Sequence, residues 1–253
     1  MGGWAPTDVL NAWRAWVQSW SPPTATRVTS GVYELYLDGT AATVMAVRGA
    51  RPVAADIPGL LQAGRDIGAQ TIDFTLGPDN SGAPPPTYVE MADAIATVDI
   101  LAVDLDTKLG SLGVTDSGDL QVDEVRTFDQ FADYERTCAA AWGYPLPTEA
   151  SIRVGFGELT SGHFLVYRRG QPVGTGGYSL VEQVARLWGA AVVPSARGVG
   201  AYRALVAARI ADAVARGATL GLVHAAASSS PILQRLGFHK FGEQRIFRAT
   251  TAQ

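Results

Sequence analysis

Cysteine and long apolar runs are scarce in this chain. Its 253 residues include one cysteine, Cys138, which excludes an internal disulfide and fits a reducing compartment. No apolar run approaches the roughly 18 residues of a membrane span, and residues 1–6 lack the basic and apolar regions of a signal peptide. We therefore expect a cytoplasmic protein with no membrane partner.

Residues suited to metal binding or covalent catalysis are also few. The three histidines, His163, His224 and His239, are scattered without the spacing of metal ligands, so no metal site is expected. No Gly-x-Ser-x-Gly sequence or Cys/His pair indicates a covalent nucleophile. Basic residues form no cluster dense enough to predict nucleic-acid binding.

The composition instead predicts a folded protein with a charge difference between its halves. Hydrophobic residues make up 47% of the chain, enough for one large or two small domains. Residues 1–118 carry 13 Asp and Glu against 6 Lys and Arg, whereas residues 119–253 carry 11 against 14. The more basic second half suits a polyanionic ligand.

The most informative segment is residues 192–205, VVPSARGVGAYRAL. An apolar strand runs into a short Arg-Gly loop, which opens directly into an amphipathic helix. Such a turn directs free backbone N–H groups and the positive end of a helix dipole at one spot. Its glycines have no Cβ, so a ligand can approach the backbone closely. That spot suits a pyrophosphate, although the spacing matches neither the P-loop nor the dinucleotide-binding fingerprint.

Periodicity and turn residues predict alternating elements in the rest of the chain. Helices are expected over residues 8–20, 57–68, 88–97, 128–142, 149–156, 200–216 and 230–236. Strands are expected over residues 32–37, 43–47, 71–76, 98–103, 120–126, 163–168, 172–179, 185–193 and 219–224, with one or two more in 238–248. Residues 109–119, rich in Gly, Ser and Asp, are expected to be a linker.

Two motifs resemble those of the GNAT N-acyltransferase superfamily. Its acyl-CoA loop, Arg/Gln-x-x-Gly-x-Gly/Ala after a strand ending in Val-x-Pro, aligns with Arg197, Gly200 and Tyr202, the last of which departs from the pattern. About 30 residues later, SPILQRLGF (residues 230–238) resembles the second signature, a short helix ending in Leu-Gly-Phe. The expected β-α-α-β-β-β-α-β-α-β order of the second half is the topology that this resemblance implies.

The first half echoes the later part of the second half but has no counterpart of the Arg197–Tyr202 loop. As a whole the chain resembles the tandem-GNAT proteins of actinobacteria. The resemblance implies an α/β protein with two tandem GNAT folds, each a mixed central sheet flanked by helices. We expect a degenerate copy at residues 1–108 and an acyl-CoA-binding copy at residues 120–253.

The resemblance also implies where acyl-CoA binds. Pantetheine is expected in a gap where the fourth strand of the second copy splays from the fifth, with a strand N–H polarising the thioester carbonyl. Arg197 would either contact a phosphate or be solvated at the edge of the loop. The implied ligands of the cofactor are the backbones of Val192 and Val193, the N–H groups of Gly198, Val199, Gly200, Ala201 and Tyr202, and Ser228.

Two residues that the resemblance leads one to expect, a tyrosine acid and an asparagine that binds pantetheine, are missing from this chain. Leu233 stands where a Tyr acid is common, and Ala226 stands where an Asn binds pantetheine. Ser229 is a candidate hydroxyl donor for catalysis, although the adjacent serines are also typical of a helix cap. His224 is either a general base for the ammonium or a half-buried hydrogen-bonding residue, and Glu182 is either an acceptor-binding carboxylate or a solvated loop charge.

The function that these observations favour is direct transfer of an acetyl group from acetyl-CoA to the amine of a small molecule. The first copy would shape the acceptor site and is a candidate surface for homodimerisation. Two alternatives stay open: an acyltransferase for longer acyl-CoA or for a hydroxyl acceptor, and a non-catalytic CoA-binding sensor or scaffold.

Overall fold

A computed structural model describes residues 3–16, 21–22, 24–47, 56–78, 93–108, 118–160 and 162–252. The chain divides into two compact units. The first unit comprises Met1–Leu10, Leu101–His224 and Ser228–His239, and the second comprises Asn11–Ile100, Ala225–Ala227 and Lys240–Gln253. These units differ from the expected linear division, because β5 (Asp93–Asp104) passes from the second unit into the first and β11 (His239–Thr250) lies almost entirely in the second. Most of the expected linker lies outside the described residues.

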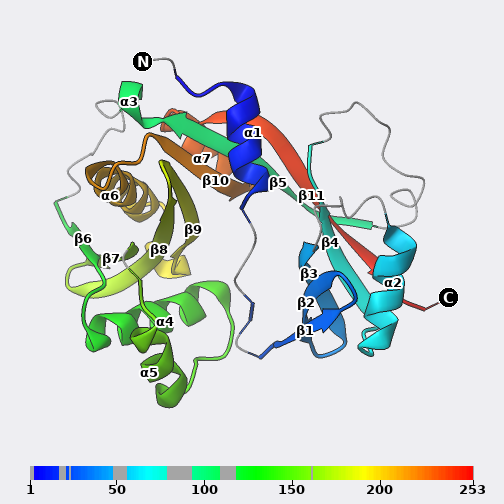
Figure 1. The fold of residues 1–253 in the computed structure, drawn as a ribbon. Coiled ribbons are helices and arrows are strands. Elements are labelled where there is room, and N and C mark those ends of the chain that lie inside the picture. Colours follow the sequence, from blue (N-terminus) through cyan, green and yellow to red (C-terminus); the bar gives the residue numbers. More distant parts are fainter. Residues whose placement is uncertain are drawn as a thin grey trace. The chain divides into compact units, whose positions relative to one another are not determined.

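The first unit follows the expected β-α-α-β-β-β-α-β-α order, with β11 completing the series (Figure 1). Its strands are ordered β10-β9-β8-β7-β6, and the end of β5 adjoins β10. β6 to β9 are antiparallel neighbours, whereas β9 and β10 are parallel. The elements are β6 (Leu120–Glu124), α4 (Phe128–Trp142), α5 (Glu149–Gly157), β7 (His163–Arg168), β8 (Gln171–Val181), β9 (Val184–Val192), α6 (Ala201–Ala215), β10 (Leu220–Ala226) and α7 (Ser230–Arg235).

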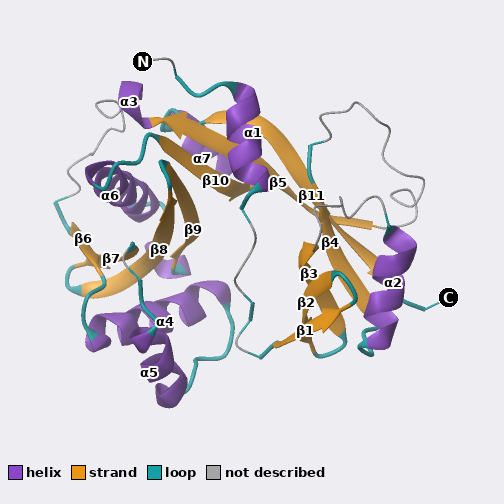
Figure 2. Ribbon diagram, viewed as in Figure 1, coloured by secondary structure: helices purple, strands orange, loops and turns teal. Residues whose placement is uncertain are grey.

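Helices cover both faces of the central strands of this unit, with α4 and α5 on one side and α6 on the other (Figure 2). Phe164, Leu165 and Val166 are consecutive and all buried, which requires apolar cover on both faces. Leu165 packs in a cluster with residues of α4 and α5. On the other face, the Tyr178 hydroxyl donates to Asp212 of α6.

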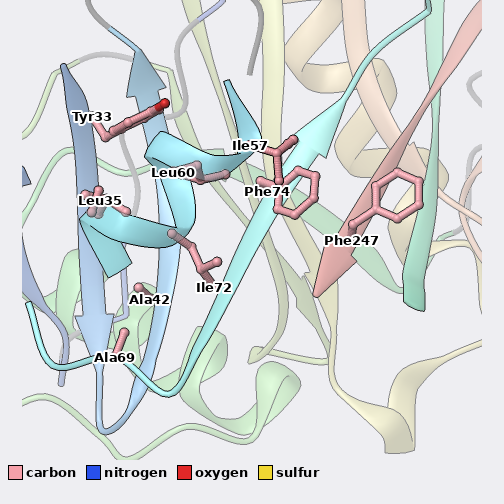
Figure 3. Packing of buried hydrophobic residues seen from close by; sticks show 10 residues of the cluster. Tyr33, Leu35, Ala42, Ile57, Leu60, Ala69, Ile72, Phe74 and Phe247 are labelled. Atoms are coloured by element: carbon pink, nitrogen blue, oxygen red, sulfur yellow. The ribbon is translucent and has the colours of Figure 1, made fainter. Parts of the chain in front are cut away.

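The second unit has its own core, built on strands in the order β1-β2-β3-β4-β11-β5. Its remaining elements are β1 (Thr26–Ser30), β2 (Tyr33–Asp38), β3 (Ala41–Val47), α2 (Ile57–Asp66) and β4 (Thr71–Leu76). The apolar residues of α2, including Ile57 and Leu60, are buried in one cluster with Leu35 and Ile72 of the strands (Figure 3). Phe74 stacks on Phe247 with ring centroids 5.8 Å apart.

Two short helices remain: α1 (Pro6–Arg14), which passes from the first unit into the second after Leu10, and α3 (Leu105–Lys108) in the first unit. The expected helix over residues 8–20 therefore ends early, and residues 17–20 lie outside the described residues. Residues 93–97 are a strand where a helix was expected, because β5 pairs in a sheet, and such tertiary pairing overrides the local helix propensity of its alanines. Within the described residues, no helix is both long and apolar enough to cross a membrane.

Candidate active site

Two parallel strands of the first unit diverge where an acyl-CoA cleft was expected. β9 and β10 pair from Val184 with Leu220 as far as Leu187 with Val223. Beyond that point β9 continues to Val192 and β10 to Ala226, but no further pair joins them among the described residues. The diverging ends have backbone groups on facing edges that no strand fills, a geometry into which an extended ligand can add.

A bulge lies on the same stretch of β9, on its edge with β8. The register with β8 shifts between Thr175 and Gly177, so that Gly189 and Ala190 of β9 oppose the single residue Gly176, one extra residue on β9. Gly189 has a φ of 62°, in the region that favours glycine. The Trp188 ring occupies the space of a side chain at Gly177, because a Cβ there would lie 2.1 Å from the ring. The chain therefore bends at the point where it leaves β10.

A buried cation braces this bulge. Arg209 of α6 is only 2% exposed, and its Nη1 donates to the carbonyl oxygens of Gly177 at 3.0 Å and Trp188 at 3.3 Å. Its Nε donates to the carbonyl oxygen of Leu205 at 3.1 Å. Arg209 was not among the residues expected at the site, although it falls on the apolar stripe of α6, seven residues after Tyr202, where a charge is unexpected.

The Arg-Gly loop between β9 and α6 leaves the start of the helix open. Gly198 and Gly200 have φ values of 81° and 93°, and a Cβ at Gly198 would meet nothing within 4 Å. Gly200 is the N-cap of α6 and makes no side-chain cap. The first intrahelical bond that reaches Gly200 comes from Ala204, so the preceding N–H groups have no acceptor within the helix. This uncapped, positive helix end fits an anion.

Three helices, α2, α4 and α5, contrast with α6 because a side chain caps each of them. Thr127 caps α4 in a capping box with Gln130, and Thr148 caps α5. In the second unit Asp56 caps α2, and its Oδ1 accepts the N–H of Gly59 at 3.0 Å. A carboxylate thus already occupies the positive end of α2, whereas the first turn of α6 has no acidic residue.

At the end of β9, only some of the backbone N–H and C=O groups face the edge where a ligand could bind. The N–H of Val193 donates to Val173 of β8 at 2.9 Å, and its carbonyl oxygen accepts the N–H of Ala196. Because direction alternates along a strand, Val192 turns its N–H and C=O toward the opposite edge, where β10 diverges. Arg197 is exposed, and its Nε reaches back to the Val192 carbonyl oxygen at 3.3 Å.

Tyr202 and Ser229 meet although they lie 27 residues apart in the sequence. Tyr202 is half-buried at the second position of α6, and its hydroxyl shares a hydrogen bond with the Ser229 hydroxyl. Ser229 is the N-cap residue of α7 but makes no side-chain cap, so its hydroxyl does not serve the helix. Of the other expected ligands, Ala201 is buried, Val199 is half-buried and Ser228 is exposed.

His224 follows Val223, the last residue of β10 that pairs with β9. It is half-buried, and burial, followed by the charge of Arg186, lowers its pKa from 6.5 to about 4. The imidazole is therefore neutral at physiological pH, but it is a weak base. Its place at the divergence agrees with the expected mouth of the cleft.

Glu182 lies at the other end of β9. It is exposed, with a φ of 54°, in the turn before the strand. Six residues separate it from Trp188, a span of about 20 Å in an extended chain. The structure therefore does not bring Glu182 together with His224 or the glycine loop.

Trp188 of β9 packs against another aromatic side chain. Its ring lies 4.8 Å from that of His163, in an edge-to-face contact, and is half-buried. His163 in turn contacts Tyr134 of α4. Among the described residues, no group of three His, Cys, Asp or Glu side chains is arranged to hold a metal ion.

A known family model and several solved structures are similar to this chain. Residues 127–242 match the model of the Acetyltransferase (GNAT) family. No curated protein matches the chain. Among solved structures, it is similar to a GCN5-related N-acetyltransferase from Kribbella flavida, with 16% identity over 89% of each chain and a TM-score of 0.59.

Two further structures have the same fold. A tandem GNAT protein from the clavulanic acid biosynthesis pathway is 18% identical over 92% of this chain and 85% of its own, with a TM-score of 0.61. A GCN5-related N-acetyltransferase from Sphaerobacter thermophilus is 13% identical over 98% and 86%, with a TM-score of 0.65. The expected tandem GNAT fold is thus confirmed. Residues 127–242, which contain the open end of α6 and the divergence of β9 from β10, are thus similar to the GNAT family of acetyltransferases.

Proposed function

We propose that this acyltransferase moves the acetyl group of acetyl-CoA directly to the amine of a small molecule. The observation that carries the proposal is the uncapped N-terminus of α6, which directly follows a strand that has diverged from its parallel neighbour. In this assignment the N–H groups of Gly198 to Tyr202 hold the pyrophosphate. The pantetheine arm lies along the edge of β9 on which Val192 turns its backbone groups.

Direct transfer is favoured over a covalent acyl-enzyme. Cys138 is the only cysteine of the chain, and it is buried against Thr175, with its Sγ 3.3 Å from the hydroxyl. Burial raises its pKa to about 11, so the thiol stays protonated and is a poor nucleophile. The amine must therefore attack the thioester itself, in its neutral form.

The environment of His224 limits its part in this reaction. A base with a pKa of about 4 takes a proton from an ammonium group only at a large cost, because each unit of difference is worth about 1.4 kcal/mol. We assign His224 the role of orienting water at the mouth of the cleft, with solvent as the final proton acceptor. Glu182, at the far end of β9, takes no part.

The proposal is tested with purified protein and acetyl-CoA. Thiol release is measured with a panel of primary amines and a matched panel of alcohols, and CoA binding is measured by calorimetry. We expect CoA binding and thiol release with at least one amine. Release with alcohols alone would contradict the amine acceptor, and tight CoA binding without transfer to any acceptor would support a sensor instead.

The site of the pyrophosphate is tested by placing a carboxylate at the open helix end, as Asp56 does at α2. Gly200→Asp should weaken CoA binding by about tenfold or more, because it sets a negative charge against the phosphates. Gly200→Asn adds a side chain of the same shape without the charge, and it should lose less of the affinity for CoA. Gly217→Asp is the matched control, since Gly217 lies beyond the other end of α6 with a φ of 95°. Equal affinity in all three variants would overturn the placement.

A further inference from the structure

The departing thiolate of CoA needs a proton, and the position where the family often supplies a tyrosine is Leu233. Leu233 is 1% exposed and has no proton to give. The acid must therefore come from another element near the diverging strands. The pair of hydroxyls formed by Tyr202 and Ser229 joins the first turn of α6 to the N-cap of α7.

Neither hydroxyl caps the helix to which it belongs. Ser229 makes no cap on α7, and α6 has no side-chain cap in the turn that contains Tyr202. The Tyr202 residue is half-buried and so is not fully enclosed by protein. A proton donor at a catalytic cleft needs both a fixed geometry and access to the reacting atom.

Arg209 adds a positive charge to the pair of hydroxyls formed by Tyr202 and Ser229. It lies seven residues after Tyr202 on the same apolar stripe of α6, and its cation interacts with the Tyr202 phenol. The guanidinium of Arg209 donates to the backbone carbonyls of Leu205, Gly177 and Trp188, and among the described residues no carboxylate forms a salt bridge with it. Its positive charge is therefore not cancelled by an ion pair and can stabilise a negative charge that forms nearby.

We propose that Tyr202 is the catalytic acid of this acetyltransferase, with Ser229 and Arg209 as its positioning partners. The amine nitrogen forms a bond with the thioester carbon, and the carbon–sulfur bond then breaks with its electron pair on sulfur. The Tyr202 hydroxyl gives its proton to that sulfur. The phenolate left behind is stabilised by Arg209 and regains a proton through Ser229 from solvent, which has received the proton lost by the amine.

The electrostatics of the phenol fit an acid. Burial raises the pKa of Tyr202, so the hydroxyl keeps its proton at neutral pH, while the Arg209 charge and the Ser229 hydrogen bond act in the opposite direction. The two unexpected residues of α6, a tyrosine at position 202 and an arginine at position 209, thus have one common explanation. The inference rests on the proposed acetyl transfer.

The first test measures binding without turnover. If the Tyr202 hydroxyl lies against the sulfur, the wild-type protein should bind CoA about fivefold more tightly than desulfo-CoA, the worth of one hydrogen bond. Tyr202→Phe should abolish that preference and leave the affinity for desulfo-CoA unchanged. Tyr167→Phe, a half-buried tyrosine of β7 in the same unit, is the control and should keep the preference. A preference that survives in Tyr202→Phe would overturn the proposal.

The second test separates proton donation from structural support. Tyr202→Phe should lower kcat with acetyl-CoA about a hundredfold, in the range of a lost general acid. The acetyl selenoester analogue of CoA should restore most of that loss, because a selenolate is a much weaker base than a thiolate and leaves without a proton. An equal loss with both substrates would assign Tyr202 a structural role only and overturn the proposal.

The outcomes for the wild-type chain distinguish this inference from the proposed function. A wild-type chain that binds CoA and acetylates no acceptor would overturn the proposed function, and the catalytic role of Tyr202 with it. A wild-type chain that acetylates an amine, beside a Tyr202→Phe variant of equal kcat, would overturn the role of Tyr202 alone.

Discussion

Arg209 donates a hydrogen bond from Nη1 to the carbonyl oxygen of Trp188 at 3.3 Å and so ties α6 to the bulge of β9. Trp188 is the first residue of β9 beyond its pairing with β10. The cation therefore holds the strand at the point where it leaves its neighbour. Gly176 leaves room for this contact, because a Cβ there would lie 3.1 Å from the guanidinium carbon.

Replacing Arg209 should destabilise the fold. Arg209→Met retains much of the apolar volume but leaves the carbonyl oxygens of Gly177 and Trp188 without their donor, so we expect the free energy of unfolding to fall by about 1–3 kcal/mol. Urea denaturation measures this loss. Arg203→Met, an exposed arginine of the same helix, should change stability by less than about 0.5 kcal/mol. Equal stability of the two variants would contradict a bracing role.

Asp56 should matter for the stability of the second unit and not for CoA binding. Its carboxylate caps α2 and also accepts the Tyr33 hydroxyl, so Asp56→Ala should cost about 1–2 kcal/mol in the free energy of unfolding. The affinity for CoA should stay unchanged, with one CoA bound per chain in calorimetry. A second molecule of CoA bound by the wild-type chain would show that the first copy is not degenerate as a CoA site.

His224 should contribute to the pH dependence of stability rather than to that of catalysis. Its pKa is about 4 in the folded state and 6.5 when unperturbed, so only the unfolded chain gains this proton between those values. Stability from this group is therefore complete above about pH 6.5 and declines as the pH falls toward 4. Urea denaturation at pH 7.5, 5.5 and 4.5 measures this effect. As the pH falls, the free energy of unfolding should decline less in His224→Gln than in the wild type.

The exposed His239 provides the control for this pH dependence. His239→Gln, which removes an exposed imidazole of the same chain, should follow the wild-type curve. Between pH 6 and 9 the pH–rate profile of His224→Gln should keep its wild-type shape, since the imidazole is neutral throughout. Loss of an ionisation from that profile would restore His224 as a general base.

Much of the first unit could be predicted because its signals are local. α4 runs over the predicted residues, where a capping box at Thr127 and a left-handed glycine at position 143 mark its ends. The glycine loop was recognisable for the same reason, since a strand, a turn with positive φ and a helix follow one another within 15 residues. The helix expected over residues 88–97 was wrong for 93–97, because pairing in a sheet decides the state of β5.

The sequence by itself determined the order of the elements in the first unit and the residues of the anion-binding turn, because neighbouring residues specify caps, glycine conformations and helix faces. Only the tertiary structure decided that β9 parts from β10 after Leu187, that Arg209 braces the bulge, and that Tyr202 meets Ser229. These relationships join residues from separate elements. They depend on how strands and helices pack, a long-range outcome that no local pattern encodes.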